Sequence, residues 1–117
     1  MMRLTPDGLA LLEREGQRYH VFVEVDRTTE LLGVWRQKVA RYVDGAASGS
    51  ANKALGIDRF GVIVAAASSQ RLHSIRRLVH TLTDRLFWFA PLENIKRDGF
   101  WSSVWFRSVG DQKQSIL

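Results

Sequence analysis

The sequence lacks several residue types and segments that would indicate common functions. Its 117 residues include no cysteine and only two prolines and three histidines. The absence of cysteine excludes disulfide bonds, zinc–thiolate centres and a thiol nucleophile. No apolar run approaches the ~18 residues that a membrane-spanning helix needs, and the N-terminus has no signal-peptide pattern. We therefore expect a cytoplasmic protein without a membrane partner.

What is present fits one globular domain over residues 1–117. Hydrophobic residues make up 45% and charged residues 25%, which is ordinary for a folded domain of this size. Lysine and arginine number 17 against 12 acids, so the net charge is +5. A modest basic excess is compatible with a polyanion partner, although it also keeps many small domains soluble. Together with the acidic cluster described below, it predicts contact with DNA.

The first third of the chain predicts a β-hairpin. Strands are expected over 9–14 and 18–26, joined by Glu15-Gly16-Gln17, in which Gly16 can adopt a positive φ. In the second strand, tyrosine and valine alternate with histidine, phenylalanine and acids. Both faces are thus partly apolar, which favours a strand inside a sheet that is covered on both sides.

The rest of the chain alternates between helical and strand patterns. The first predicted elements are a helix over 28–45, a flexible loop over 45–56 that could carry a short helical extension over 51–55, and a buried strand over 59–66. A helix capped by Ser68-Ser69 follows, with Leu72, Ile75, Val79 and Leu82 at core spacing. The last predicted elements are a strand over 86–90, a turn over 91–94, an aromatic-rich strand over 99–107 and a frayed tail over 110–117. This order predicts an α/β fold with a mixed sheet flanked by helices.

Three carboxylates are predicted to converge at one end of the sheet. Glu24 and Asp26 share one face of their strand, and counting outward from the turn places Asp7 across from Glu24. Hard oxygen ligands of this kind hold Mg²⁺ over a phosphodiester. Lys38 lies on the helix face that packs toward this end, where it could stabilise developing negative charge.

Structural alternatives exist for each acid. Asp26 could cap the following helix, and Asp7 after a proline could be a turn residue. Glu24 lies between valines and needs a partner, which Arg27 or Lys38 could provide in a purely structural ion pair.

Basic and aromatic residues suggest further roles. The residues predicted to contact nucleic acid are Arg27 and the helical arginines Arg71, Arg76 and Arg77. His73 and His80 on the same helix are expected on a solvated face. Trp88, Trp101 and Trp105 are expected in the core or in an interface, and the aromatic end over 100–106 could form a homodimer contact. No glycine-rich phosphate loop or nucleophile elbow occurs.

These residues resemble a known family. Pro6-Asp7, a hairpin, then Glu24-x-Asp26 and a helix resemble the PD-(D/E)XK nuclease superfamily. More narrowly, the sequence is similar to the C-terminal domain of replication-relaxation proteins of bacterial plasmids and mobile elements. The residues that carry this similarity are Pro6-Asp7-Gly8, the run 22–30, Lys38, Tyr42, the Ser-Ser-x-Arg-Leu run at 68–72 and Leu-Phe-Trp-Phe-Ala at 86–90.

The resemblance implies a restriction-endonuclease-like fold and a role in plasmid replication or its control. It places Asp7 and Glu24 at metal-ligand positions, and Asp26 where the superfamily lysine usually stands. Lys38 then corresponds to a migrated lysine, and all four residues are the predicted catalytic set with Mg²⁺ as cofactor. Two functions stay open: a metal-dependent endonuclease, or an inactive DNA-binding or homodimeric assembly module on the same fold.

The resemblance also implies two missing parts. The superfamily core usually begins with a helix before the hairpin, where this sequence has only residues 1–5, and the narrower family carries an N-terminal winged-helix DNA-binding region. The chain is therefore expected to be a fragment, a minimal paralogue or an obligate dimer.

Overall fold

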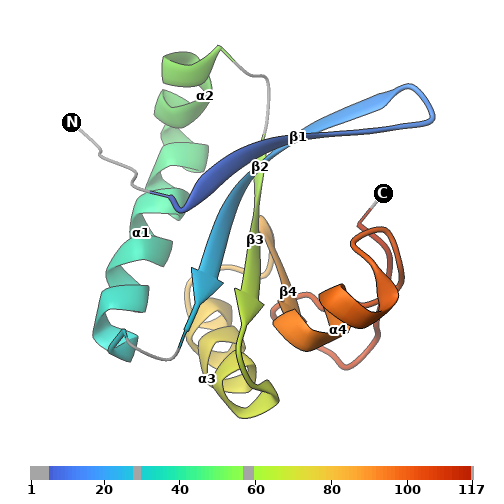
Figure 1. Ribbon diagram of the computed structural model, residues 1–117. Helices are drawn as coiled ribbons and strands as arrows, with labels where there is room; N and C mark the ends of the chain where they lie inside the picture. The colour runs from blue at the N-terminus through green and yellow to red at the C-terminus, as the bar shows by residue number, and fades with distance from the viewer. Residues whose placement is uncertain (1–5, 28–29, 57–59, 117) are drawn as a thin grey trace.

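The computed structural model describes residues 6–27, 30–56 and 60–116, and it shows an α/β fold (Figure 1). One mixed sheet has the strand order β1-β2-β3-β4. The strands are β1 (Gly8–Arg14), β2 (Gln17–Asp26), β3 (Phe60–Ala66) and β4 (Phe87–Pro91), and the helices are α1 (Leu32–Ser48), α2 (Ser50–Leu55), α3 (Ser69–His80) and α4 (Leu92–Asp98). The predicted class and the order hairpin, helix, strand, helix, strand are confirmed.

The hairpin forms where the sequence predicts it. β1 and β2 pair antiparallel up to Arg14 and Gln17, which leaves a two-residue turn. Glu15 and Gly16 in this turn have φ values of 52° and 81°. A turn with two positive φ values matches the right-handed twist of the strands it joins. β2 then pairs in parallel with β3, and β3 in parallel with β4.

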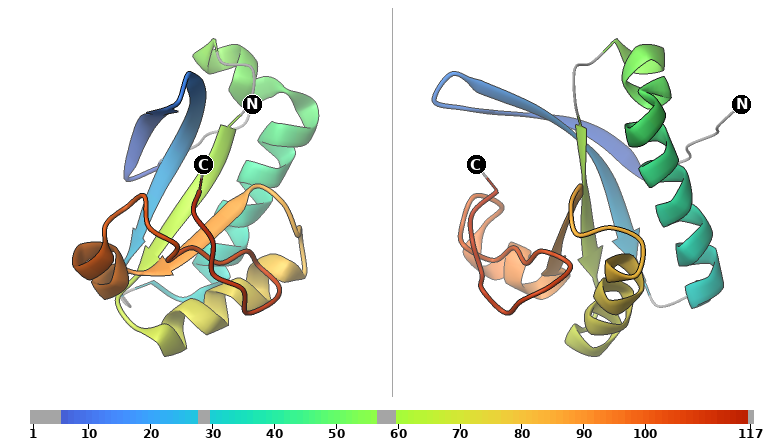
Figure 2. Two further views of the ribbon diagram at one scale, coloured as in Figure 1. Left: turned by 90° about the vertical axis from the view of Figure 1, so that its right-hand side faces the viewer. Right: turned by 180° about the vertical axis from the view of Figure 1, so that it is seen from behind.

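The two faces of the sheet are covered by different parts of the chain (Figure 2). Helices α1 and α3 pack on one face, where Trp35, Val39 and Ile75 join the side chains of β2, β3 and β4 in one core. The C-terminal segment, which includes α4, covers the other face and forms a second core around Trp88 and Trp105. The expectation that β2 lies inside a sheet covered on both faces is confirmed, although Val23 and Val25 on its second face are only half-buried.

The structure corrects the prediction for residues 28–56. Residues 28–29, where the first helix was expected to start, lie outside the described residues, and α1 runs from Leu32 through Gly45 to Ser48. Residues 45–48 belong to α1 and not to the expected loop, and α2 follows directly after Gly49, which confirms the short helical extension left open for 51–55. Gly45 is buried inside the helix, whereas Gly49 has φ 72° and ends it. The alanines and serines of this stretch are tolerated in a helix, so their weak hydrophobicity did not indicate a loop.

β3 and α3 agree closely with their predictions. β3 is buried along its whole length, although Arg59 at its expected start lies outside the described residues. Ser68 is the N-cap of α3, and its side chain accepts a hydrogen bond from the backbone N–H of Arg71. The helix ends at His80, so Leu82 is 38% exposed and Leu78 takes the expected core position.

The C-terminal third differs most from the prediction. Residues 92–98 form α4 instead of a short turn. The expected strand over 99–107 forms only isolated bridges, Phe89 with Phe106 and Trp105 with Gln114. Trp105 is nevertheless fully buried in the second core, so its burial does not require a continuous β-ladder.

The tail over 110–117 is not frayed in its described part. Gln114 exchanges two backbone hydrogen bonds with Trp105, and Ile116 is only 5% exposed in the second core. The open face of the sheet needs apolar cover, and this segment supplies part of it. No helix within the described residues has the length and apolar character that a membrane crossing requires.

Candidate functional site

The predicted acids lie at the edge of the sheet where β2 and β3 end. β2 places Glu24 and Asp26 on the face that packs against α1 and α3, and Asp26 pairs with Ala66 at the end of β3. The pairing of Gly8 with Val23 puts Asp7 opposite Glu24, as counting from the turn predicts. The exposed Asp7 is fixed there because one carboxylate oxygen accepts a hydrogen bond of 2.8 Å from the backbone N–H of Val25.

Glu24 is a buried carboxylate with two protein donors. It is 1% exposed, and Tyr42 Oη donates a hydrogen bond of 2.7 Å to Oε1, while Lys38 Nζ lies 3.4 Å from Oε2. Burial raises the pKa of Glu24, and the charge of Asp7 raises it further, whereas the bonds from Tyr42 and Lys38 lower it. The net pKa of Glu24 is above its ordinary value. The structural ion pair considered for Glu24 is therefore present, with Lys38 as the partner.

Lys38 also binds an acid that the sequence reasoning did not select. Its Nζ lies 2.9 Å from Glu30 Oε1 and 5.1 Å from the centre of the Trp35 ring. Burial lowers the pKa of Lys38, but the hydrogen bond to Glu30 and the charge of Glu24 outweigh this effect and raise it. Oε2 of Glu30 is buried without a hydrogen-bond partner. Glu30 lies just before α1 and Lys38 in the second turn of that helix, so their eight-residue spacing, unlike a spacing of three or four, gave no signal of this contact.

Asp26 is bound from two helices. Arg71 of α3 donates from Nε to Oδ2 at 2.8 Å and from Nη2 to Oδ1 at 3.1 Å, and Trp35 Nε1 of α1 donates to Oδ1 at 3.1 Å. Arg71 also donates to the backbone carbonyl of Glu30. The hydrogen bond to Asp26 raises the pKa of Arg71 above its ordinary value. The alternative role as helix cap does not hold, because Leu31 is the N-cap of α1.

This geometry does not fit the predicted Mg²⁺ site of three acids. Among the described residues, no group of three or more histidine, aspartate or glutamate side chains is arranged to hold a metal ion. Both carboxylate oxygens of Asp26 accept from Arg71, which neutralises a charge that a cation would otherwise meet. The residues left for a cation are Asp7 and Glu24, with Lys38 beside them. A hollow of about 470 Å³ lies at this edge, and Asp7, Arg27 and Glu30 line it.

The four arginines predicted to contact nucleic acid have different environments. Arg71 has a side chain only 13% exposed and is held by Asp26. Arg76 donates to the backbone carbonyls of Arg107 and Gly110, and its guanidinium lies 4.8 Å from the Phe106 ring centre, so it anchors the C-terminal segment. Arg27 and Arg77 are exposed. Of these four arginines, Arg27 and Arg77 are the ones whose side chains are exposed for phosphate contacts.

The remaining predicted residues are placed as follows. His73 and His80 are exposed, and His80 contacts Asp84. Trp88 and Trp105 are buried in the second core, while Trp101 is 38% exposed. The aromatic end over 100–106 therefore contributes largely to the chain's own core.

Comparison with known protein families gives a match over the first half of the chain. The replication-relaxation family model matches residues 1–59, just over half of the 117 residues. The chain belongs to the replication-relaxation family. The match includes all the acids of the site and Lys38, and membership suggests a role in plasmid replication. No curated protein and no solved structure matches this replication-relaxation protein.

Proposed function

We propose that this replication-relaxation protein is a DNA-associated module of a plasmid or other mobile element, with a PD-(D/E)XK-like core that binds DNA without cleaving it. The observation that supports this most is the ion pair of Asp26 with Arg71. At the position where the nuclease superfamily usually has a lysine, this chain has a carboxylate that is neutralised by a guanidinium from another helix. The mixed sheet and its order of hairpin, helix, strand, helix and strand agree with such a core.

Charge compensation weakens the repulsion between the acidic edge and a DNA backbone. Arg71 offsets Asp26, and Lys38 lies between Glu24 and Glu30. Without these pairs, the carboxylates would repel phosphates, because buried charge is weakly screened. The cluster is then a structural centre that joins α1 and α3 to the end of β2.

Phosphate contacts would come from the exposed arginines. Arg27 follows β2 directly, and Arg77 lies on the outer surface of α3. Together with a net charge of +5, they favour contact with the DNA backbone independent of base sequence.

The test is the salt dependence of DNA binding. Fluorescence anisotropy of a labelled duplex is measured over a range of salt concentrations for the natural protein and for the double variant Arg27→Gln/Arg77→Gln. The slope of log K against log salt is negative, and each lost phosphate contact should reduce its magnitude by about 0.9. The slope of the double variant should therefore be shallower by about 1.8. The matched control is Arg97→Gln on α4, an exposed arginine paired with Asp98, which should leave the slope unchanged. Absence of binding at low salt, or an unchanged slope in the double variant, would refute the proposal.

A second candidate function is Mg²⁺-dependent phosphodiester hydrolysis. One observation favours it: Asp7 lies opposite Glu24, and Lys38 Nζ is 3.4 Å from the Glu24 carboxylate. Asp7 and Glu24 would hold the ion, which would supply Lewis-acid activation of the phosphate, and Mg²⁺ is often bound through one or two carboxylates. Lys38 would stabilise negative charge on phosphate oxygens.

Calorimetry and plasmid nicking separate the two candidates. The nuclease predicts heat on addition of Mg²⁺ or Mn²⁺ and nicking of supercoiled DNA, both lost in Asp7→Asn. This variant keeps an oxygen for the Val25 N–H and leaves the fold intact, which its thermal unfolding would verify. The non-cleaving module predicts neither heat nor nicking, together with DNA binding in the anisotropy measurement.

A further inference from the structure

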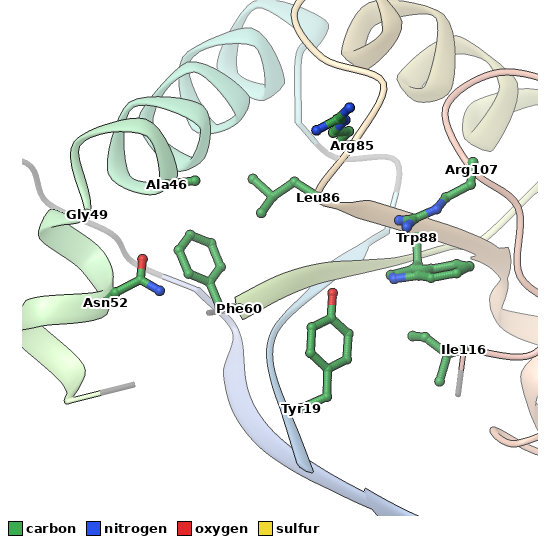
Figure 3. Close-up of a pocket in the computed structure, with 10 residues that line it drawn as sticks. All are labelled: Tyr19, Ala46, Gly49, Asn52, Phe60, Arg85, Leu86, Trp88, Arg107 and Ile116. Atoms are coloured by element: carbon green, nitrogen blue, oxygen red, sulfur yellow. The ribbon is translucent and has the colours of Figure 1, made fainter. Parts of the chain in front are cut away.

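A second site lies at the opposite end of the sheet from the acids. A pocket of about 760 Å³ opens beside Phe60 at the start of β3 and Leu86 just before β4 (Figure 3). The β2–β3 register pairs His20 with Phe60 at this end and Asp26 with Ala66 at the other. The pocket is therefore separate from the carboxylate cluster, and none of the described residues that line it is acidic.

Trp88 brings an unsatisfied donor to this pocket. It is 8% exposed, and its Nε1–H has no hydrogen-bond partner. By contrast, Trp35 Nε1 donates to Asp26, and Trp105 Nε1 donates to the carbonyl of Phe100. Figure 3 shows the indole nitrogen of Trp88 on the side of the ring that faces the pocket. A buried N–H without an acceptor is unfavourable, so a ligand that supplies an acceptor atom would be stabilised.

Two arginines add positive charge beside this donor. The Arg107 guanidinium stacks on Trp88, 3.6 Å from the ring centre, and one of its nitrogens donates to the carbonyl of Phe87. Burial lowers the pKa of Arg107, and the charge of Tyr19 opposes this effect only in part. Arg85 is an exposed residue at the rim of the same pocket. A bound anion would satisfy both charges.

The apolar part of the pocket is shaped by a glycine. A Cβ at Gly61 would lie 1.9 Å from the hydroxyl of Tyr19, so only glycine leaves room for the tyrosine ring over β3. The side chains of Phe60 and Leu86 extend the apolar lining next to it (Figure 3). The pocket thus joins donors and positive charge on one side with aromatic and aliphatic surface on the other, which is typical of small-molecule sites.

We propose that this pocket binds a small organic anion, with a carboxylate or phosphate oxygen accepting from Trp88 Nε1, the two arginines neutralising its charge, and an apolar or aromatic body against Phe60 and Leu86. The site does not depend on the DNA contacts proposed above, since it uses other residues at the far end of the sheet. A ligand here would connect the second core to the α2 side of the molecule, because Asn52 and Arg107 line the same space.

The indole N–H signals of the four tryptophans offer a direct test. Proton–nitrogen correlation spectra are recorded while deoxyadenosine monophosphate or benzoate is added to the full chain, and Trp88→Phe identifies the signal of Trp88. We expect the Trp88 signal to move saturably at millimolar ligand or below, while the hydrogen-bonded Trp35 and Trp105 signals stay in place. A response to the nucleotide alone indicates a phosphate ligand, and a response to benzoate alone indicates a carboxylate ligand.

Variants and neutral compounds complete the test. Arg85→Gln should weaken binding about tenfold, which corresponds to about 1.4 kcal/mol, whereas Arg97→Gln on the exposed surface of α4 should not change it. Deoxyadenosine and benzyl alcohol, which lack the anionic group, should leave the Trp88 signal unmoved. The proposal is overturned if neither anion moves that signal, if the neutral compounds move it equally, or if Arg97→Gln weakens binding as much as Arg85→Gln.

Discussion

Arg71 Nε lies 2.8 Å from Asp26 Oδ2, and this pair joins residues 45 positions apart in the chain. A second contact, from Nη2 to Oδ1 at 3.1 Å, makes the ion pair bidentate. Asp26 is the last residue of β2 and Arg71 lies in the first turn of α3, so the pair links the end of β2 to the start of α3. A two-point guanidinium–carboxylate contact restricts both distance and orientation.

The first prediction concerns this pair. Arg71→Met should destabilise the fold by about 3 to 5 kcal/mol, because it leaves the carboxylate of Asp26 buried without its charge partner. Adding Asp26→Asn should recover part of the loss, with a coupling energy of about 2 kcal/mol in the double-mutant cycle. The free energy of unfolding of each variant is measured by urea denaturation. The control Arg77→Met, on the exposed surface of the same helix, should change stability by less than about 0.5 kcal/mol. Additive effects of the two substitutions would contradict the assigned pair.

The second prediction concerns alkaline pH and Tyr42. Burial and the hydrogen bond to Glu24 raise the pKa of Tyr42 far above its ordinary value of 10.0. Above that pH the unfolded chain releases the phenol proton while the folded chain keeps it, so stability falls as pH rises. In this pH range, the free energy of unfolding of the natural protein should fall by about 1.4 kcal/mol per pH unit more than that of Tyr42→Phe. Urea denaturation at a series of alkaline pH values gives both slopes, and parallel slopes would argue against the buried phenol. Lys38 and the other basic groups titrate in both proteins, so their contribution cancels.

The third prediction concerns the contact between Gly61 and Tyr19. Gly61→Ala should cost about 1 to 3 kcal/mol, because the new methyl group overlaps the tyrosine hydroxyl at 1.9 Å. Tyr19→Leu in the same chain should recover most of this loss by removing the ring. The matched control is Gly33→Ala in α1, where nothing lies within 4 Å. That substitution should stabilise the helix by about 0.5 to 1 kcal/mol, as thermal unfolding would show.

The fourth prediction concerns the C-terminal segment. Ile116→Ala should destabilise the protein by about 2 to 5 kcal/mol, since Ile116 is 5% exposed in the second core. Val109→Ala serves as the control, because Val109 is 56% exposed and its truncation should matter little. Chemical denaturation compares the two variants. If Ile116→Ala were as stable as the control, the segment would be no more than loosely attached.

Local patterns account for the parts of the structure that the sequence predicted well. The hairpin follows from Gly16 and from alternation within one strand, and both depend on residues adjacent in the chain. The same counting placed Asp7 opposite Glu24 correctly, because strand register passes along a hairpin without interruption. Spacing along one helix likewise indicated that Lys38 faces the end of β2, where it contacts Glu24.

Contacts between distant segments account for the rest. Nothing near Asp26 in the sequence indicates that Arg71 binds it, so a metal ligand or a helix cap were the natural interpretations. The aromatic residues around Trp105 suggested a strand because they are β-favouring, yet the requirement to cover an open sheet face decided their conformation. The small residues between Gly45 and Gly49 gave no apolar periodicity, and packing extended the helix through them.

The sequence by itself determined the α/β class, the hairpin, the position of the acids at one end of β2 and, through its match over residues 1–59, the family. These follow from periodicity and from motifs that are contiguous in the chain. Only the tertiary structure decided how the acids are neutralised, which arginines stay exposed, and where the pocket beside Trp88 forms. The physical reason is that charge compensation, burial and cavities depend on groups brought together by folding, and their separation along the chain carries no local signal.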